Sequence, residues 1–127
     1  MVQSINSNVE LTTSGVSYLS LLGGKVGKFL LGDQGLEFYN NANVNDYIQI
    51  PWGSIEKIGG SVSRGKVGRH FQVFTDKGKF LFASKDAGRI LKIARKHIGN
   101  EKVVKLPTLV QTIGYKLQNL FAKKENI

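Results

Sequence analysis

The sequence predicts an α+β fold in which a small antiparallel β-barrel of about seven strands is capped by a helix. Short stretches of alternating apolar and polar residues are separated by glycine-rich turns, which is typical of strands. Glycine accounts for 15 of 127 residues, well above the usual share of about 7%, and this suits tight turns and bent strands. One stretch of apolar residues at helical spacing follows the last hairpin and is placed to close the barrel.

The first half of the chain contains five alternating segments. We expect strands at residues 9–12, 16–21, 26–31, 36–39 and 47–50. Gly15 is expected to break the first strand from the second, and Gly23-Gly24 turns the chain. The tetrapeptide at 32–35 is a hairpin signal, and 40–46 is a polar loop. The fifth strand ends at Pro51, which cannot sit in a central ladder.

The second half continues with strands at 54–63, 71–75 and 80–82. Gly59-Gly60 indicates a bulge or barrel corner inside the first of these strands. Residues 64–69 read as a flexible basic loop, and residues 76–79 close a hairpin between the last two strands.

Two helices are expected after these strands. Ser84 is a suitable N-cap and Gly99 a suitable C′ residue for the first helix. Its buried stripe is Ala87, Ile90, Leu91, Ala94 and Ile98. After a connector at 102–106, Pro107 fits the first turn of a second amphipathic helix. We therefore expect a barrel with its capping helix over residues 1–99 and a helical extension over 100–127, within a single domain.

Composition narrows the class of protein. The chain has no Cys, which excludes disulfides and thiolate sites. No basic segment precedes an apolar run at the start, and no apolar run approaches the roughly 20 residues of a membrane span. We expect a cytoplasmic protein, with peripheral membrane attachment left open. The net charge of +9 is uneven: residues 1–60 carry −2 and residues 61–127 carry +11.

Three segments together resemble the pleckstrin-homology/GRAM superfold. Residues 27–38 resemble its strand pair with a short turn, and 50–58 (Ile-Pro-Trp-Gly-Ser-Ile-Glu-Lys-Ile) resemble its Ile-Pro element. Residues 71–82, followed by Ser84-Lys85-Asp86, resemble its last hairpin and the start of its capping helix. The resemblance covers residues 9–98 and implies a fold that usually binds a partner.

Nearly the whole chain is similar to the ManO-type family, which is encoded beside mannose-family phosphotransferase genes in Gram-positive bacteria. The similarity is carried by Met1-Val2-Gln3-Ser4, Ser17-Tyr18-Leu19, Glu37-Phe38-Tyr39-Asn40, 46–52 and 82–86. It implies a non-enzymatic, regulatory role connected to sugar uptake. No established catalytic residues can be carried over from it.

The residues themselves suggest no catalytic set, metal site or cofactor. His70 and His97 lie in different predicted elements, and the aspartates at 33, 46, 76 and 86 suit turns or a cap. Trp52 reads as core in preference to an exposed partner anchor. His97 fits the end of the capping helix, where positive charge is favoured.

Two candidate binding surfaces remain. The first would hold a phosphate or carboxylate and comprises Arg64, Lys66, Arg69, His70, Arg89, Lys92 and Lys96. The alternative for its loop is a solvated, mobile hairpin. The second surface is a partner helix with Leu117, Leu120, Phe121, Lys123 and Lys124. That helix could equally pack on its own barrel, in a homo-oligomer or on a membrane.

Three functions follow from these surfaces. The first is a binding, adaptor or regulatory protein whose partner is a protein, with a phosphotransferase component as one option. The second is a nucleic-acid-binding regulator of the operon, and the third is a module for anionic membrane surfaces. An enzyme is not expected, because no acid–base or nucleophile set is evident.

Overall fold

The strands of the computed structural model form one eight-stranded sheet, in the order β4-β3-β2-β1-β7-β6-β5-β8. The structure describes residues 3–20, 23–43 and 45–107. The elements are β1 (Val9–Ser20), β2 (Gly23–Gly32), β3 (Gly35–Asn40), β4 (Tyr47–Pro51), η1 (Trp52–Ser54), β5 (Ile55–Ser63), β6 (Lys66–Thr75), β7 (Gly78–Ala83), α1 (Ala87–Ile98), η2 (Asn100–Lys102) and β8 (Val103–Lys105). The α+β class is confirmed, as are the hairpin turns predicted at 32–35 and 76–79.

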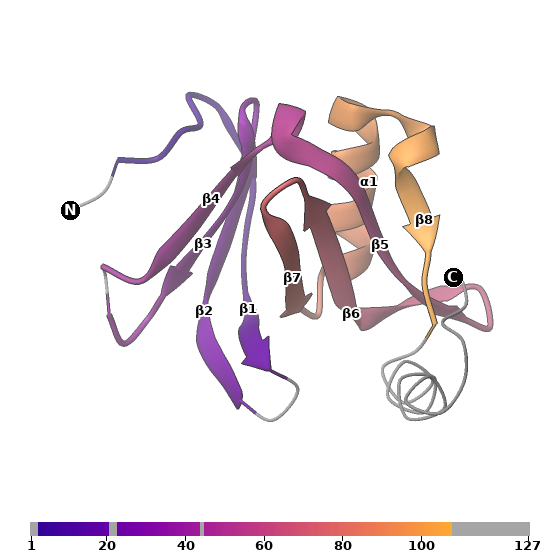
Figure 1. Ribbon diagram of the computed structural model, residues 1–127, viewed down its shortest axis with the longest axis horizontal. Helices are drawn as coiled ribbons and strands as arrows, with labels where there is room; N and C mark the ends of the chain where they lie inside the picture. Colours follow the sequence, from indigo (N-terminus) through magenta and orange to yellow (C-terminus); the bar gives the residue numbers. More distant parts are fainter. Residues whose placement is uncertain (1–2, 21–22, 44, 108–127) are drawn as a thin grey trace.

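The sheet bends at β1, which pairs with β2 along its length and with β7 through Val16–Tyr18. The bend creates two layers, β1 to β4 on one side and β7, β6, β5 and β8 on the other (Figure 1). The predicted break at Gly15 is wrong, because β1 is continuous there. A Cβ at Gly15 would lie 2.3 Å from the Phe29 ring and 2.4 Å from the Ala83 carbonyl oxygen, so the residue permits close packing at the bend.

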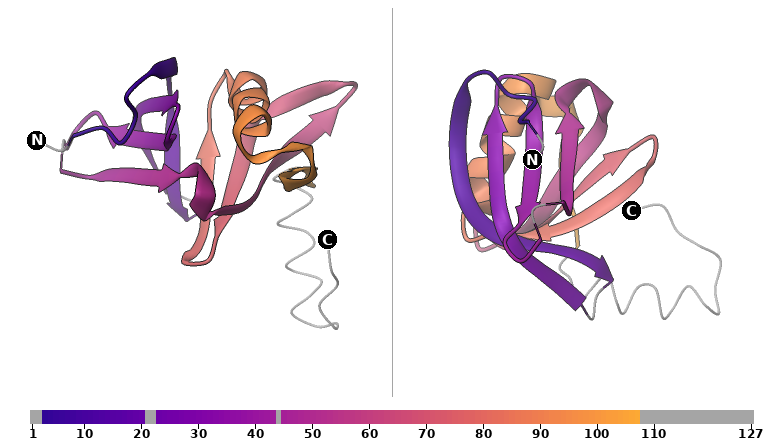
Figure 2. Two further views of the ribbon diagram at one scale, coloured as in Figure 1. Left: turned by 90° about the horizontal axis from the view of Figure 1, so that it is seen from above. Right: turned by 90° about the vertical axis from the view of Figure 1, so that its left-hand side faces the viewer.

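The predicted closed barrel is wrong in one respect: the sheet is open. Its end strands are β4 and β8, which do not pair with each other. After β4, η1 carries the chain across to the second layer, and the two layers splay apart in Figure 2. The segment predicted as a connector is β8, which pairs in parallel with β5 through Ile58–Gly60. Residues Val103–Lys105, inside that segment, therefore belong to the sheet.

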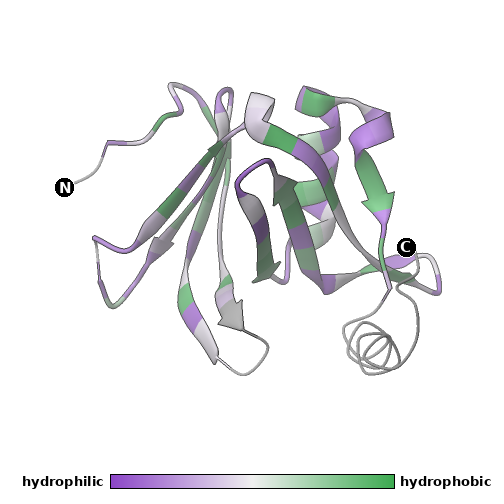
Figure 3. Cartoon of the chain, in the orientation of Figure 1, coloured by the Kyte–Doolittle hydropathy of each residue, from purple (hydrophilic) through white to green (hydrophobic). Residues whose placement is uncertain are grey.

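The core lies between the two layers and under α1. Hydrophobic and hydrophilic residues alternate along the strands in Figure 3, as a half-buried sheet requires. Phe29, Phe38, Phe71 and Phe82 are almost wholly buried and contact one another. The predicted helical stripe is confirmed: Ala87, Ile90, Leu91 and Ala94 are buried, and Ile98 packs against them.

Trp52 belongs to this core, with 7% of its surface exposed. Its predicted role in the core is confirmed. The second amphipathic helix predicted from Pro107, with Leu117, Leu120, Phe121, Lys123 and Lys124, lies outside the described residues. Within the described ranges, no helix has both the length and the apolar character needed to cross a bilayer.

Candidate functional site

The predicted basic loop is a β-hairpin. β5 and β6 pair as far as Ser63 and Lys66, which leaves Arg64 and Gly65 as a two-residue turn. Both turn residues have positive φ, 53° for Arg64 and 76° for Gly65, as a type I′ turn requires. Residues 66–69, predicted as part of a loop, are instead the start of β6, and Lys66 and Val67 pair with Ser63 and Val62 of β5. We call residues 61–69 the hairpin arm.

The hairpin arm lies against the start of α1. The Cβ of Val67 would be 3.8 Å from a Cβ added at Gly88, and the Arg69 carbonyl accepts a hydrogen bond from the Ser84 amide at 2.9 Å. Arg69 is exposed, and its backbone lies beside the start of α1 through this bond.

His70 points to the face of β6 opposite that of the buried Phe71. It is half-buried, and its ring contacts Tyr18 of β1 in a tilted arrangement, with centroids 5.8 Å apart. The structure thus separates His70 from Arg69, although the two are adjacent in sequence. The grouping of His70 with the basic residues is wrong for this reason, and His70 contributes to the outer face of the sheet.

The exposed side of α1 carries a line of positive charge. Residues 89, 92 and 96 recur at helical spacing opposite the buried stripe, as predicted, and all three are exposed. The structure adds two exposed residues that the sequence reasoning missed. We call the whole set the cationic ridge: Lys85, Arg89, Lys92, Arg95 and Lys96. Extending the spacing of the ridge back by four residues from Arg89 would have found Lys85.

Two members of the cationic ridge have acidic neighbours. Lys96 Nζ lies 2.8 Å from a carboxylate oxygen of Glu10, and Arg89 lies 3.9 Å from Asp86. Both cations are 66% exposed, so these pairs neutralise little of the outward charge. Among the described residues, Lys85, Lys92 and Arg95 have no ion pair.

The acidic first part and the basic second part of the chain lie on different sides of the molecule. Residues 3–60 carry three Lys and five acidic residues, and they comprise the layer of β1 to β4, then η1 and the first part of β5 in the second layer. Residues 61–107 carry twelve Lys or Arg and three acidic residues. This cationic half contains the hairpin arm, β6, β7, α1 and β8, which lie at the opposite side of Figure 1 from β2, β3 and β4.

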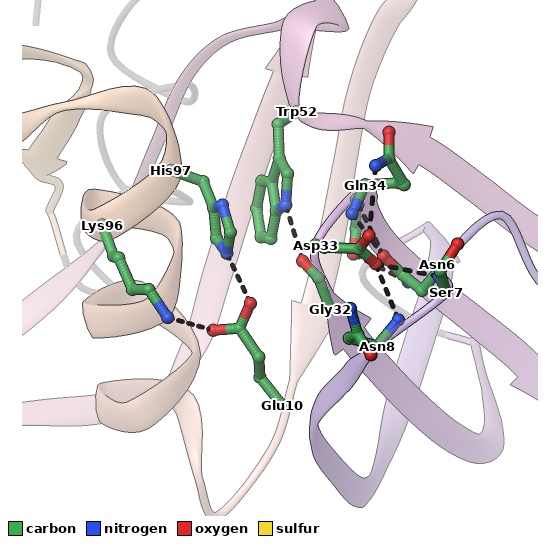
Figure 4. A network of polar contacts seen from close by, with 11 residues as sticks. Asn6, Ser7, Asn8, Glu10, Gly32, Asp33, Gln34, Trp52, Lys96 and His97 are labelled. Carbon is green, nitrogen blue, oxygen red and sulfur yellow. Dashed lines mark hydrogen bonds and ion pairs between the residues drawn. The ribbon is translucent and has the colours of Figure 1, made fainter.

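The last turn of α1 is joined to β1 and η1 by a polar cluster (Figure 4). The Trp52 indole N–H donates to the Gly32 carbonyl at 2.8 Å, and its ring stacks on His97. Glu10 contacts the edge of the same imidazole ring, with a carboxylate oxygen 2.7 Å from His97 Nε2. The hydrogen bond from Lys96 lowers the pKa of Glu10, burial opposes this effect, and His97 adds to the lowering.

The start of α1 differs from the prediction. The N-cap is Asp86, not Ser84, and its side chain makes no capping hydrogen bond. Its carboxylate instead accepts a hydrogen bond from the Thr13 hydroxyl at 2.6 Å. Ser84 donates from its hydroxyl to the Ser14 carbonyl at 2.8 Å. Both side chains join the helix start to β1, so the ridge is held on the sheet at both ends.

The sequence did not predict one buried polar cluster, which is centred on Glu37. Glu37 is fully buried on the outer face of β3 and accepts hydrogen bonds from five residues. The donors are Ser4 Oγ, the Ile5 amide, Asn6 Nδ2, Tyr39 Oη and Gln49 Nε2. Burial alone would raise the pKa of Glu37, but the hydrogen bonds from Ser4, Tyr39, Ile5 and Asn6 together lower it.

Residues 3–8 form a strap that Glu37 holds over the sheet. Asn6 Oδ1 accepts from the amides of Gln34 and Gly35, and Asp33 accepts from the amides of Ser7 and Asn8. The role of Asp33 as a turn residue is confirmed. Sequence reasoning had no signal for the strap, because residues 3–8 show no periodicity. Within the described residues, no group of three or more His, Asp or Glu is arranged to hold a metal ion.

Comparison with known proteins gives one family match. The model of the family described as "Domain of unknown function (DUF956)" matches residues 1–117. A search of curated proteins finds no match.

Three solved structures are similar. The C-terminal domain of an unknown protein from Leishmania infantum has a TM-score of 0.61 and 12% identity, covering 73% of this chain and 85% of that chain. The Spt16D Pob3N heterodimer gives 0.55 and 15%, covering 81% and 57%. The hSac2 domain from human phosphoinositide phosphatase Sac2 gives 0.48 and 13%, covering 79% and 77%. The neighbours include pleckstrin-homology-like domains, and the expected pleckstrin-homology-like fold is confirmed.

Proposed function

This chain belongs to the family described as a domain of unknown function (DUF956), and we propose that it is a non-enzymatic binding protein that engages an acidic partner. The observation that carries the proposal is the cationic ridge beside the hairpin arm. Arginine and lysine side chains there project from a rigid helix and a paired hairpin. A rigid, exposed array of one charge sign suits recognition of a surface of opposite charge.

The acidic groups near the cationic ridge serve its attachment. Glu10 contacts Lys96 and His97, and Asp86 contacts Thr13. Each of these carboxylates makes a structural hydrogen bond that holds α1 on the sheet. A binding role depends on the exposed positive charges of the cationic ridge. It requires no proton transfer by Glu10 or Asp86.

We place the partner among the proteins of a mannose-type sugar phosphotransferase system. This step rests on the similarity to the ManO-type family, which is encoded with such systems. The protein would act as an adaptor or regulator by docking its cationic half on an acidic face of a transporter component. The neutral-to-acidic half, with β2, β3 and β4, would stay outside that contact.

Affinity capture from cells that express the transporter tests the proposal. We expect the wild-type chain to retain a phosphotransferase component, and a Lys85→Glu/Lys92→Glu variant to lose most of it. Both residues are exposed and unpaired among the described residues, so the variant should fold. The matched control is Lys28→Glu, an exposed change of the same kind on β2. Equal retention by all three chains, or capture of no such component, contradicts the proposal.

The same charge favours a second candidate, a polyanion such as nucleic acid or an anionic membrane surface. Gel shifts over a salt series test the first, since phosphate contacts weaken steeply as salt rises. Flotation with vesicles, with and without acidic lipid, tests the second. Binding that Lys85→Glu/Lys92→Glu abolishes and Lys28→Glu preserves would assign the polyanion to the cationic ridge. No binding at low salt removes this candidate.

A further inference from the structure

The open edge of the sheet has a backbone pattern that the register determines. The Asn40 amide donates to the Asp46 carbonyl, and the Trp52 amide donates to the Gln34 carbonyl. Both bonds join residues that the β3–β4 register places directly opposite each other. Hydrogen-bonded pairs alternate along an antiparallel ladder. Ile48 and Ile50 are therefore the β4 residues that bond to β3.

It follows that Tyr47 and Gln49 direct their backbone N–H and C=O groups away from β3, toward the free edge. Within the described residues, no backbone hydrogen bond joins that edge to another segment. Pro51 ends the edge with a carbonyl and no N–H. Tyr47 and Gln49 thus offer two N–H donors and two C=O acceptors at the free edge. Such a set is self-complementary, because each residue of one copy can pair with the other residue of a second, antiparallel copy.

A groove runs beside this edge. It has a volume of about 130 Å³ and lies between β4 with η1 and the β6–β7 turn. Ile50 and Phe80 give it an apolar floor, and Asp76 and Lys77 lie at its rim. Ile48 and Phe80 are only partly buried although both pack against the core. The gap between the two layers therefore leaves apolar surface uncovered next to unpaired backbone groups.

The two sheet edges differ in charge. β4 has the sequence Tyr-Ile-Gln-Ile-Pro, with no charged residue, and lies at the side of the molecule away from the cationic ridge. β8 carries Lys105 and follows Lys102, within the cationic half. Two copies of a chain with a net charge of +9 repel each other least when their cationic halves are far apart. Pairing through β4 achieves this separation, whereas pairing through β8 does not.

We propose that β4 is the interface for a second copy of this chain, through antiparallel β4–β4 pairing about a two-fold axis. The axis passes between Ile48 and its counterpart, so that Tyr47 of each copy pairs with Gln49 of the other. Four backbone hydrogen bonds result. On the core side of the sheet, Ile48 of one copy then lies opposite Ile48 of the other, and each covers apolar surface of its counterpart beside the groove. A closed two-fold contact of this kind pairs the β4 edge of each copy with that of the other, so no further copy can add at β4.

The sharpest test measures amide exchange in the wild-type chain. Hydrogen exchange is followed from about 1 μM to about 1 mM, a range that covers weak association. We expect the Tyr47 and Gln49 amides to gain protection as concentration rises, in step with dimer formed in sedimentation velocity. The Ile48 and Ile50 amides are bonded to β3 and should stay protected throughout. A monomer across the whole range, or a dimer in which Tyr47 and Gln49 exchange freely, overturns the proposal.

A pair of variants isolates the backbone group. Tyr47→Pro removes an N–H that β3 does not use, at the first residue of an edge strand where proline is tolerated. Tyr47→Ala removes the same side chain, including its stack on Tyr39, and keeps the N–H. We expect Tyr47→Ala to dimerise and Tyr47→Pro to remain monomeric. Equal dimerisation of both variants overturns the proposal. If Tyr47→Pro does not fold, the amide exchange of the wild-type chain tests the same interface without it.

Salt distinguishes this edge from the cationic ridge. Screening weakens repulsion between the two cationic halves, so the β4 dimer should strengthen as salt rises. A dimer that weakens with salt would place the contact on charged residues and overturn the proposal. The Lys85→Glu/Lys92→Glu variant provides a second reading, because it should preserve or strengthen the β4 dimer. Failure of partner capture by the cationic ridge would leave these results unchanged.

Discussion

Trp52 and His97 stack almost in parallel, with ring centroids 4.9 Å apart and an angle of 9° between the ring planes. Trp52 comes from the short turn that carries the chain from β4 to β5, and His97 from the last turn of α1. The contact therefore joins the crossing point between the two layers to the helix that bears the cationic ridge. Glu10 on β1 completes the junction through His97 and Lys96.

We predict that Trp52→Phe destabilises the protein more than His97→Ala. The first change can keep an aromatic ring against His97 but leaves the buried Gly32 carbonyl without its donor, at a cost of about 1–3 kcal/mol. The second removes the ring contact, worth about 0.5–1.5 kcal/mol, and the contact with Glu10, which keeps Lys96 as a partner. Urea denaturation followed by circular dichroism measures both. A larger loss for His97→Ala would show that the contacts of His97 with Trp52 and Glu10, not the indole hydrogen bond, fix this junction.

Two glycines should respond to alanine in opposite directions. Gly15→Ala places a methyl group within 2.4 Å of the Ala83 carbonyl oxygen, so the bend in β1 must shift, at about 1–3 kcal/mol. Gly88→Ala adds a methyl at 3.8 Å from Val67, an ordinary contact, in a helix where alanine is favoured by about 1 kcal/mol. Thermal and urea unfolding measure the two shifts. A stabilising Gly15→Ala would contradict the close packing at the bend.

Glu37 should make stability depend on pH in the acid range. Its folded pKa lies below the usual value of 4.5, so the unfolded chain binds the proton more readily. The stability it contributes is present above pH 4.5 and is lost as the pH falls through the folded pKa. Glu37→Gln should flatten this part of the stability curve and cost about 1–3 kcal/mol at pH 7, because buried donors lose their acceptor.

The matched control for this experiment is Glu56→Gln. Glu56 is an exposed residue on β5, and the change removes the same charge without touching the strap. We expect the stability at pH 7 to change by less than about 0.5 kcal/mol. A steep acid loss that persists in Glu37→Gln would assign the pH dependence to other carboxylates, such as Glu10, whose pKa is also lowered.

Local patterns predicted the strands and hairpins well, because alternation and turn residues act over a few positions. Contacts between distant segments were not predictable in this way. Gly15 reads as a strand breaker unless the approach of Phe29 and Ala83 is known, and β8 is three residues that become a strand only beside β5. Glu37 looks like one polar residue between two apolar ones. Its environment depends on a strap without periodicity.

The candidate site was predicted in part. The spacing of Arg89, Lys92 and Lys96 defines one helix face, so their grouping on the ridge follows from the sequence. Arg69 and His70 were grouped because they are adjacent, whereas alternation along β6 sends adjacent side chains to opposite faces. The alternation of Phe71, Gln72 and Val73 carried that signal and needed only to be extended backward by two residues.

Arg64 provides a test that separates stability from binding. It occupies a left-handed turn position with φ of 53°, which costs a residue other than glycine, asparagine or aspartate about 1–2 kcal/mol. Asn-Gly is the preferred pair for this turn type. We therefore expect Arg64→Asn to raise the free energy of unfolding by about 1 kcal/mol while weakening capture of the acidic partner, because one cation of the hairpin arm is lost. Arg64→Lys keeps both the charge and the strained backbone, so it should change neither quantity by much. Unfolding and capture are measured side by side. Partner capture by Arg64→Asn equal to that of the wild-type chain would contradict this assignment, since the positive charge at position 64 would then have no role in binding.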